Sequence, residues 1–197
     1  MQGLSHPVGE PGLIALIAGA VLFVAVVLRR RIAMRRVERN GGGSNLSRGG
    51  IFLQAIGYAL TAFGPVRIAL PASSSSAMLG GVAVAALMAG AIALFVSATR
   101  EMGRNWSFAA RMLDDHQLVR SGIFARLRHP IYLAMTLYLI ALALALGHFV
   151  QLIFAAPFFL LGTAIRVGVE EGLLRERFGL EYFDYARSVK RFIPGFF

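Results

Sequence analysis

Five long apolar stretches constrain the fold of this chain more than any other feature, and polar segments separate all of them except the last two. The stretches are residues 12–28, 51–70, 77–98, 131–150 and 151–169. About 20 apolar residues in a helix cross the ~30 Å hydrocarbon core of a bilayer, and a helix bonds its own backbone polar groups. Apolar residues make up 57% of the chain, above the roughly 45–50% of globular proteins. The sequence therefore predicts an all-α, polytopic transmembrane helix bundle of about five spans.

The basic residues predict how this bundle is oriented. The formal net charge is +10, and all Lys and Arg residues except Arg67 fall in three segments, 29–50, 99–130 and 166–197. Loops on the cytoplasmic side are enriched in Lys and Arg. We therefore expect the amino terminus outside and the carboxyl terminus in the cytoplasm, in a bacterial inner membrane. Placed in this way, the positive charge marks topology and is not a nucleic-acid footprint.

Other residue types exclude several kinds of site. The chain has no cysteine, which rules out disulfides, thiolate nucleophiles and cysteine-ligated metals. No metal-ligand spacing is present among the four histidines, which are His6, His116, His129 and His148. Asp114 and Asp115, before His116, are typical of a solvated turn, so we expect no metal site. No Gly-x-Gly-x-x-Gly motif is present, which excludes a soluble Rossmann-type domain.

Composition divides the chain into two parts. We expect residues 1–98 to form three spans with a basic cytoplasmic linker. Residues 99–197 should contain a cytoplasmic loop, a two-span hairpin and a carboxyl-terminal helix. The hairpin is predicted because the last two apolar stretches nearly meet at Gly147 and His148, which leaves only a short connection. Such a connection predicts two antiparallel helices packed directly on each other.

Polar residues crowd at both cytoplasmic ends of this hairpin. Pro130 suits the first turn of the fourth span, where a missing backbone N–H costs nothing. His129 then lies at the helix entrance, beside unsatisfied N–H groups and the positive end of the helix dipole, where an anionic group can bind. At the other end, Arg166 and Glu170 are four residues apart and share a helix face.

An amphipathic cytoplasmic helix is predicted after the fifth span. Apolar residues recur there at helical spacing: Leu174, Phe178, Tyr182, Tyr185 and Val189. They form one stripe that we expect to pack under the bundle or to lie at the membrane interface. Gly179 interrupts this pattern and predicts a break into two shorter helices.

The same residues form motifs that occur together in a known family. The motifs are Leu118-Val119-Arg120-Ser121-Gly122-Ile123-Phe124, Arg128-His129-Pro130-Ile131-Tyr132, Glu170-Glu171, Phe178-Gly179-Leu180-Glu181-Tyr182, Tyr185 and Arg191-Phe192-Ile193-Pro194. In order and spacing they resemble the isoprenylcysteine carboxyl methyltransferase family, integral membrane enzymes related to the phospholipid methyltransferases. The resemblance covers about residues 100–197 and does not extend to the first spans.

The resemblance implies a methyltransferase that uses S-adenosylmethionine and releases S-adenosylhomocysteine. It implies a cofactor pocket between the last spans and the tail, lined by Arg128, His129, Pro130, Tyr132, Glu170 and Glu171 and closed by Tyr182 and Tyr185. Near the methyl acceptor it implies Arg166, with Arg104 as a further candidate for the same task. Glu171 is also the candidate base for an amine acceptor.

Three functions remain open at this point. The first is methylation of a carboxylate on a lipid-like or prenylated small-molecule acceptor. The second is methylation of a phospholipid amine or a small thiol, and the third is a non-catalytic transport or assembly protein that keeps the family's form. Few ionisable residues lie within the spans, which favours an enzyme over a transporter. We expect membrane lipids around the chain and no nucleic-acid or metal partner; the acceptor, the oligomeric state and the role of Arg67 stay open.

Overall fold

A computed structural model describes residues 5–38, 44–106 and 117–193 of the chain. The described part is built from α-helices, with two short 3₁₀ turns and one pair of two-residue strands. The elements in chain order are β1 (Pro7–Val8), α1 (Glu10–Glu38), α2 (Asn45–Ala62), β2 (Arg67–Ile68), α3 (Ser75–Met102), η1 (Gly103–Asn105), η2 (Gly122–Ala125), α4 (Pro130–Leu146), α5 (Phe149–Phe178) and α6 (Leu180–Ser188). The predicted all-α bundle is confirmed.

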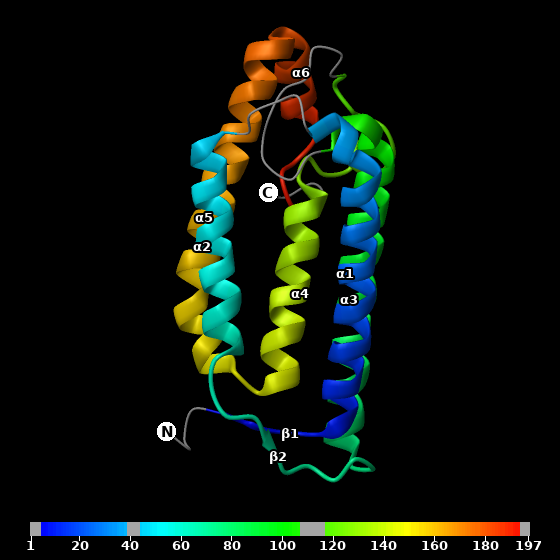
Figure 1. The fold of residues 1–197 in the computed structure, drawn as a ribbon, viewed down its shortest axis with the longest axis vertical. Helices are drawn as coiled ribbons and strands as arrows, with labels where there is room; N and C mark the ends of the chain where they lie inside the picture. Colours follow the sequence, from blue (N-terminus) through cyan, green and yellow to red (C-terminus); the bar gives the residue numbers. More distant parts are fainter. Residues whose placement is uncertain (1–4, 39–43, 107–116, 194–197) are drawn as a thin grey trace.

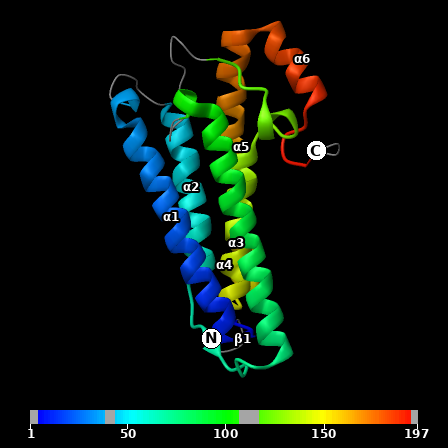
Figure 2. The ribbon, with the colours of Figure 1, turned by 90° about the vertical axis from the view of Figure 1, so that its right-hand side faces the viewer.

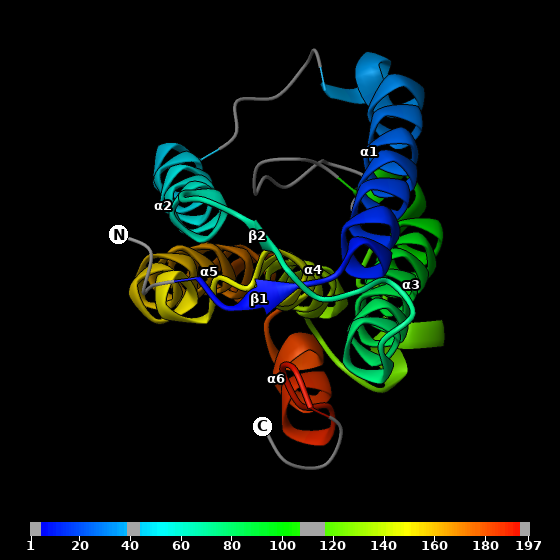
Figure 3. The ribbon, with the colours of Figure 1, turned by 90° about the horizontal axis from the view of Figure 1, so that it is seen from below.

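The long helices run side by side, with α4 between two helix pairs (Figures 1 and 3). One pair is α2 with α5 and the other is α1 with α3, and α4 packs mainly against α3. The turn at Gly147 and His148 connects α4 to α5 as predicted, with Gly147 in the left-handed conformation that ends α4. The prediction that these two helices pack directly on each other is wrong, because α5 makes its extensive contact with α2 instead.

Glycines explain why α5 pairs with α2. A Cβ atom added at Gly162 of α5 would lie 2.6 Å from the carbonyl oxygen of Gly50 in α2. A Cβ atom at Gly57 would lie 2.9 Å from the Cβ of Phe159. Small residues let helix backbones approach closely where lipid provides no hydrophobic driving force between helices. The close approach of α2 also brings its polar residues beside those of α5.

The second helix is shorter than the apolar pattern predicts. The predicted span 51–70 continues past Ala62, where α2 ends, because Gly64 has a φ of +131° and Pro65 follows it. The prediction that Arg67 lies inside a span is therefore wrong. Arg67 is exposed in β2, which pairs with β1 in parallel. This pair lies at the end of the bundle opposite to α6 (Figure 1).

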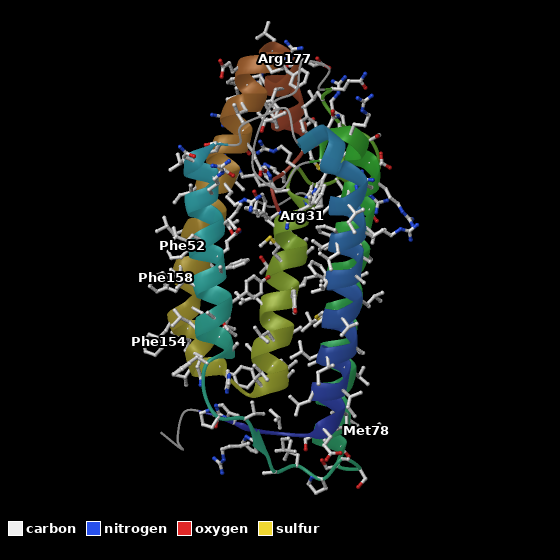
Figure 4. The ribbon with its side chains drawn as sticks, in the orientation of Figure 1. Arg31, Phe52, Met78, Phe154, Phe158 and Arg177 are labelled. Carbon is white, nitrogen blue, oxygen red and sulfur yellow. The ribbon has the colours of Figure 1, made fainter. Side chains whose placement is uncertain are left out.

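The surface of the bundle suits a membrane. Among the described residues, three helical segments are long and apolar enough to cross one, Glu10–Ala33, Ser75–Asn105 and Phe149–Phe178. The apolar helix α4 is shorter, at 17 residues, and α2 has 18, so five spans remain a prediction for these two. Phe52, Phe154 and Phe158 are exposed and point outward along the α2 and α5 side (Figure 4). The protein is an integral membrane protein.

The carboxyl-terminal segment has the predicted break at Gly179. Gly179 separates α5 from α6 with a φ of +51°, and α6 turns back from the end of α5 toward the start of α4 (Figure 2). The apolar stripe packs as one cluster, in which Tyr182, Tyr185 and Val189 are buried. We call this end of the bundle the basic end, because the arginine-rich segments meet there.

Candidate functional site

The start of α4 is held by the end of the chain. His129 is the N-cap of α4, with Pro130 in its first turn as predicted. The backbone N–H of Arg128 donates to the carbonyl oxygen of Lys190 at 2.8 Å, and that of His129 donates to the carbonyl of Arg191 at 3.0 Å. These bonds fix two polar side chains at the basic end of α4.

Glu171 of α5 is the charged centre of this arrangement. Its side chain is only 1% exposed and accepts hydrogen bonds from Arg128 at 2.9 Å and from Arg175 at 3.0 Å. Arg191 binds both carboxylate oxygens, at 2.9 and 2.8 Å. The Nε2 atom of His129 lies 3.1 Å from the same carboxylate. A buried charge is tolerated only when it is paired and hydrogen-bonded, and Glu171 fulfils this by joining α4, α5 and the tail.

Three side chains around this centre, outside the spans, have raised pKa values. The hydrogen bond to Glu171 raises the pKa of Arg191 above its ordinary value. Tyr182 receives a hydrogen bond from Arg128 at 3.2 Å, and burial raises the pKa of its hydroxyl. Tyr185 donates to the carbonyl of Phe124 at 2.7 Å, and burial raises its pKa as well. Both tyrosines therefore stay protonated at neutral pH.

A second polar group lies beside the first and centres on Glu170. The hydroxyl of Tyr132 donates to Glu170 at 2.5 Å and accepts from the Nε atom of Arg166 at 2.9 Å. The guanidinium of Arg166 also lies 5.3 Å from the centre of the Tyr132 ring, a cation–π geometry. The nearest atoms of His129 and Arg166 are each 3.8 Å from Glu170. Unlike Glu171, this carboxylate therefore has a single close hydrogen-bond donor within the described part of the chain.

A cavity of about 700 Å³ connects this group to the interior of the bundle. Its volume lies within the usual range for small-molecule sites. The polar wall at the basic end is formed by Arg128, His129, Tyr132, Arg166 and Glu170. Deeper in the bundle, mostly apolar side chains of α1, α2 and α4 line it: Phe23, Val27, Ala55, Tyr58, Ala59, Ala62, Met135, Tyr138 and Leu142. The cavity is thus amphipathic.

The structure brings most of the predicted site residues together at this cavity. Its lining includes Arg128, His129, Pro130, Tyr132, Arg166 and Glu170. Glu171 is not part of the lining, because it faces the arginines of the tail. Tyr182 and Tyr185 do not line it either, since they are buried in the cluster of α6. Arg104 lines a separate surface pocket with Glu101 and Ser121.

Several residues of the site do not stand out in the sequence. Arg175 binds Glu171, although by position alone it is a topology charge. Gln54 and Tyr58 of α2 line the cavity but belong to no motif; an amide within an apolar stretch is the signal that marks Gln54. No group of three or more His, Asp or Glu side chains able to hold a metal occurs in the described residues, and the predicted turn at 114–116 lies outside them.

Comparisons with known proteins agree with the predicted resemblance. Over 100 residues the chain is 31% identical to the Protein-S-isoprenylcysteine O-methyltransferase of Schizosaccharomyces pombe. The aligned region covers 50% of this chain and 42% of that protein. A solved structure, the eukaryotic intramembrane Ras methyltransferase ICMT (isoprenylcysteine carboxyl methyltransferase), aligns with a TM-score of 0.41 and 20% identity over 93% of this chain and 52% of that one. The chain therefore spans about half the length of these relatives.

A family model covers the segment in which the site residues lie. The model, described as Phospholipid methyltransferase, matches residues 79–181, which is just over half of the chain. This segment contains all of α4 and α5 and the polar wall of the cavity. By this match the chain belongs to the phospholipid methyltransferase family.

Proposed function

We propose that this protein is a methyltransferase that uses S-adenosylmethionine and acts on a lipid-like acceptor. The amphipathic cavity carries the proposal, because its polar wall leads directly into an apolar groove. A charged methyl donor and a lipophilic acceptor need these two environments side by side. Family membership and the similarity to a fungal isoprenylcysteine O-methyltransferase support the same reaction class.

The polar wall fits a zwitterionic cofactor. Glu170 would pair with the amino group of the cofactor, and His129 with the positive end of α4 would hold its carboxylate. The Nε atom of Arg128 is buried and has no hydrogen-bond partner in the described part of the chain. A ligand would satisfy this donor, as buried donors generally are satisfied. Glu171 and the tail would act as positioning groups that keep Arg128 and His129 in place.

Methyl transfer requires little acid–base chemistry from the protein. S-adenosylmethionine, when bound, supplies a methyl carbon on a cationic sulfur; the carbon–sulfur bond breaks, its electron pair stays on sulfur, and the acceptor atom bonds the carbon. The chain would orient the acceptor and exclude water. Arg166, held by Tyr132 on the polar wall, would bind a carboxylate acceptor through two hydrogen bonds. Such an acceptor is already ionised and needs no base.

The apolar groove suits a hydrocarbon chain. The groove-lining residues of α2 beyond Gln54 extend from Ala55 to Ala62, which corresponds to about 10 Å of helix at 1.5 Å per residue. We therefore place the acceptor's apolar part along α2 and α4. In this arrangement residues 99–197 would hold the cofactor, and residues 1–98 would supply most of the acceptor groove. A prenylated carboxylate is the acceptor class that this arrangement favours.

A phospholipid amine is the second candidate, and one observation favours it. Glu170 is a carboxylate on the cavity wall, so it would be placed to take a proton from an amine. Glu171, the base predicted from the sequence, is poorly suited to this role, because its two oxygens already accept from Arg128, Arg175 and Arg191. A small thiol would leave the groove unused.

We further propose that the basic end faces the cytoplasm of a bacterial cell. The positive-inside rule supports this orientation. The chain has no cysteine, so single cysteines introduced as Ser73→Cys and Ser121→Cys can be labelled selectively from either side. Both serines are exposed, at opposite ends of the bundle. We expect a membrane-impermeant maleimide to label only the Ser73→Cys variant in intact cells. Labelling of only the Ser121→Cys variant would show the opposite orientation.

The reaction is tested by transfer of labelled methyl groups from S-adenosylmethionine to an acceptor panel by protein purified in detergent. The panel contains prenylcysteine derivatives, phosphatidylethanolamine and a small alkyl thiol. We expect transfer to the prenylated carboxylate, and we expect Arg166→Leu to lower turnover while leaving cofactor affinity nearly unchanged. Arg177→Leu, at an exposed position at the same end of α5 (Figure 4), is the matched control. Transfer to none of the panel would refute an enzymatic function.

A further inference from the structure

We propose that Gln54 is a specificity-determining residue that hydrogen-bonds the head of the acceptor. The inference rests on the proposed function and names a chemical requirement for its substrate. The acceptor carries a hydroxyl or amide N–H donor close to the group that is methylated. Gln54 would recognise this donor through its side-chain oxygen.

The side chain of Gln54 is buried and half satisfied. It is 2% exposed, and its Nε2 atom donates to the hydroxyl of Thr163 at 2.9 Å. Its Oε1 atom is buried and has no hydrogen-bond partner among the residues that the structure describes. Gln54 also lines the cavity. A buried acceptor without a partner costs about 1–3 kcal/mol, so this atom requires an explanation.

The close approach of α2 to α5 positions this amide. Cβ atoms at Gly50 and Gly162 would clash with the opposite helix, and the Cγ of Gln54 lies 3.0 Å from the Cβ position of Gly162. The side chain is therefore held between the two helices. Its Nε2 atom bonds Thr163, and its Oε1 atom has no hydrogen-bond partner in the described residues. Its orientation is determined before any ligand binds.

The depth of Gln54 matches the head of an acceptor rather than its hydrocarbon tail. Its anchor Thr163 precedes Arg166 by three residues, or about 4.5 Å of helix rise. Below it on the same face of α2 is Tyr58, whose hydroxyl already donates to the carbonyl of Met135 at 2.7 Å. In the proposed arrangement an acceptor carboxylate lies at Arg166. A donor one or two bonds away from that carboxylate would then reach the level of Gln54.

Hydrogen bonding of this kind discriminates strongly between substrates. A site built to bond a substrate donor rejects an analogue without it, because the buried protein group is then left unpaired. The loss of one neutral hydrogen bond corresponds to roughly a tenfold change. An acceptor with the donor should therefore be preferred by about that factor in kcat/KM.

Two acceptors that differ only in this donor provide the test. One is an N-acetyl-S-prenylcysteine, which has an amide N–H beside its carboxylate. The other is the 3-(prenylthio)propionate in which hydrogen replaces the acetylamino group. We expect the wild type to prefer the first about tenfold, mainly through KM. Gln54→Leu should bring the ratio close to one without changing the affinity for S-adenosylmethionine.

The matched control is Gln151→Leu. Gln151 also has a buried side-chain oxygen without a partner in the described residues, but it does not line the cavity, so the preference should persist. Equal use of both acceptors by the wild type, an unchanged ratio in Gln54→Leu, or transfer to neither acceptor would overturn the inference. If the wild type binds the donor and methylates another acceptor, only the inference fails; if it neither binds nor transfers, the proposed function fails with it.

Discussion

Replacing Glu171 with glutamine tests whether the buried carboxylate holds the basic end together. The substitution keeps the size of the side chain but removes its charge. One of its two oxygens becomes an N–H₂ group that faces guanidinium donors instead of accepting from them. Arg191 would lose one of its two hydrogen bonds, and either Arg128 or Arg175 would lose its bond, because these two contact different oxygens. Stability and the positions of Arg128 and His129 should both change.

The structure limits the size of this effect. Breaking a fully buried ion pair costs about 3–5 kcal/mol. Glu171 is buried and the side chain of Arg128 is 12% exposed, but those of Arg175 and Arg191 are 52% and 41% exposed and keep part of their hydration. We therefore expect about 3 kcal/mol, the lower end of that range. For a chain of this length the thermal midpoint would fall by about 6–12 °C.

The assay is thermal unfolding in detergent, followed by measurement of S-adenosylmethionine affinity at a temperature where both proteins are folded. Affinity should fall, because Arg128 and His129 line the cavity. Glu181→Gln is the control: Glu181 pairs with Arg120 at 3.0 Å, but both side chains are about half exposed, so less than about 1 kcal/mol is expected. Equal midpoints for the two variants would refute the reasoning.

Three further predictions follow from other parts of the structure. Gly162→Val should destabilise the bundle by at least about 1–3 kcal/mol, since its Cβ would meet backbone of α2 at 2.6 Å; an unchanged midpoint in thermal unfolding would argue against the tight α2 contact. Tyr185→Phe removes the bond to the carbonyl of Phe124 and should cost about 1 kcal/mol in the same assay. Arg191→Lys keeps the charge but loses the two-oxygen geometry at Glu171, so faster proteolysis at the carboxyl terminus is expected.

Local rules predict the parts of the structure in which one segment decides its own conformation. Pro130 with His129 marks the start of α4, and Gly179 marks the break before α6, because both depend on backbone chemistry within a few residues. The stripe from Leu174 to Val189 packs as its spacing predicts. The choice of α2 as the partner of α5 is different. It depends on glycines from two distant segments lying at the same level along the bundle. Neither segment has a sequence pattern that predicts this contact.

The same distinction separates the two carboxylates of the site. Glu170 and Glu171 are adjacent in sequence, and only the rotation of α5 about its axis decides which one faces the cavity. That rotation is set by packing against α2 and by the arginines of α4 and the tail. Arg191 belongs to a motif, but its pairing with Glu171 becomes evident only when the bridge between Leu127 and Lys190 places the two side by side. Gln54 lies in the part of the chain without motifs.

The most direct test of the central claim is equilibrium dialysis of labelled S-adenosylmethionine against the purified protein, its Glu170→Ala variant and the Glu176→Ala variant. Glu170 lies on the polar wall of the cavity, whereas Glu176 is exposed near the end of α5. We predict saturable binding by the wild type and by Glu176→Ala, with clear weakening in Glu170→Ala. Absence of binding by the wild type, or equal affinity in all three proteins, would contradict the assignment of this cavity to the methyl donor.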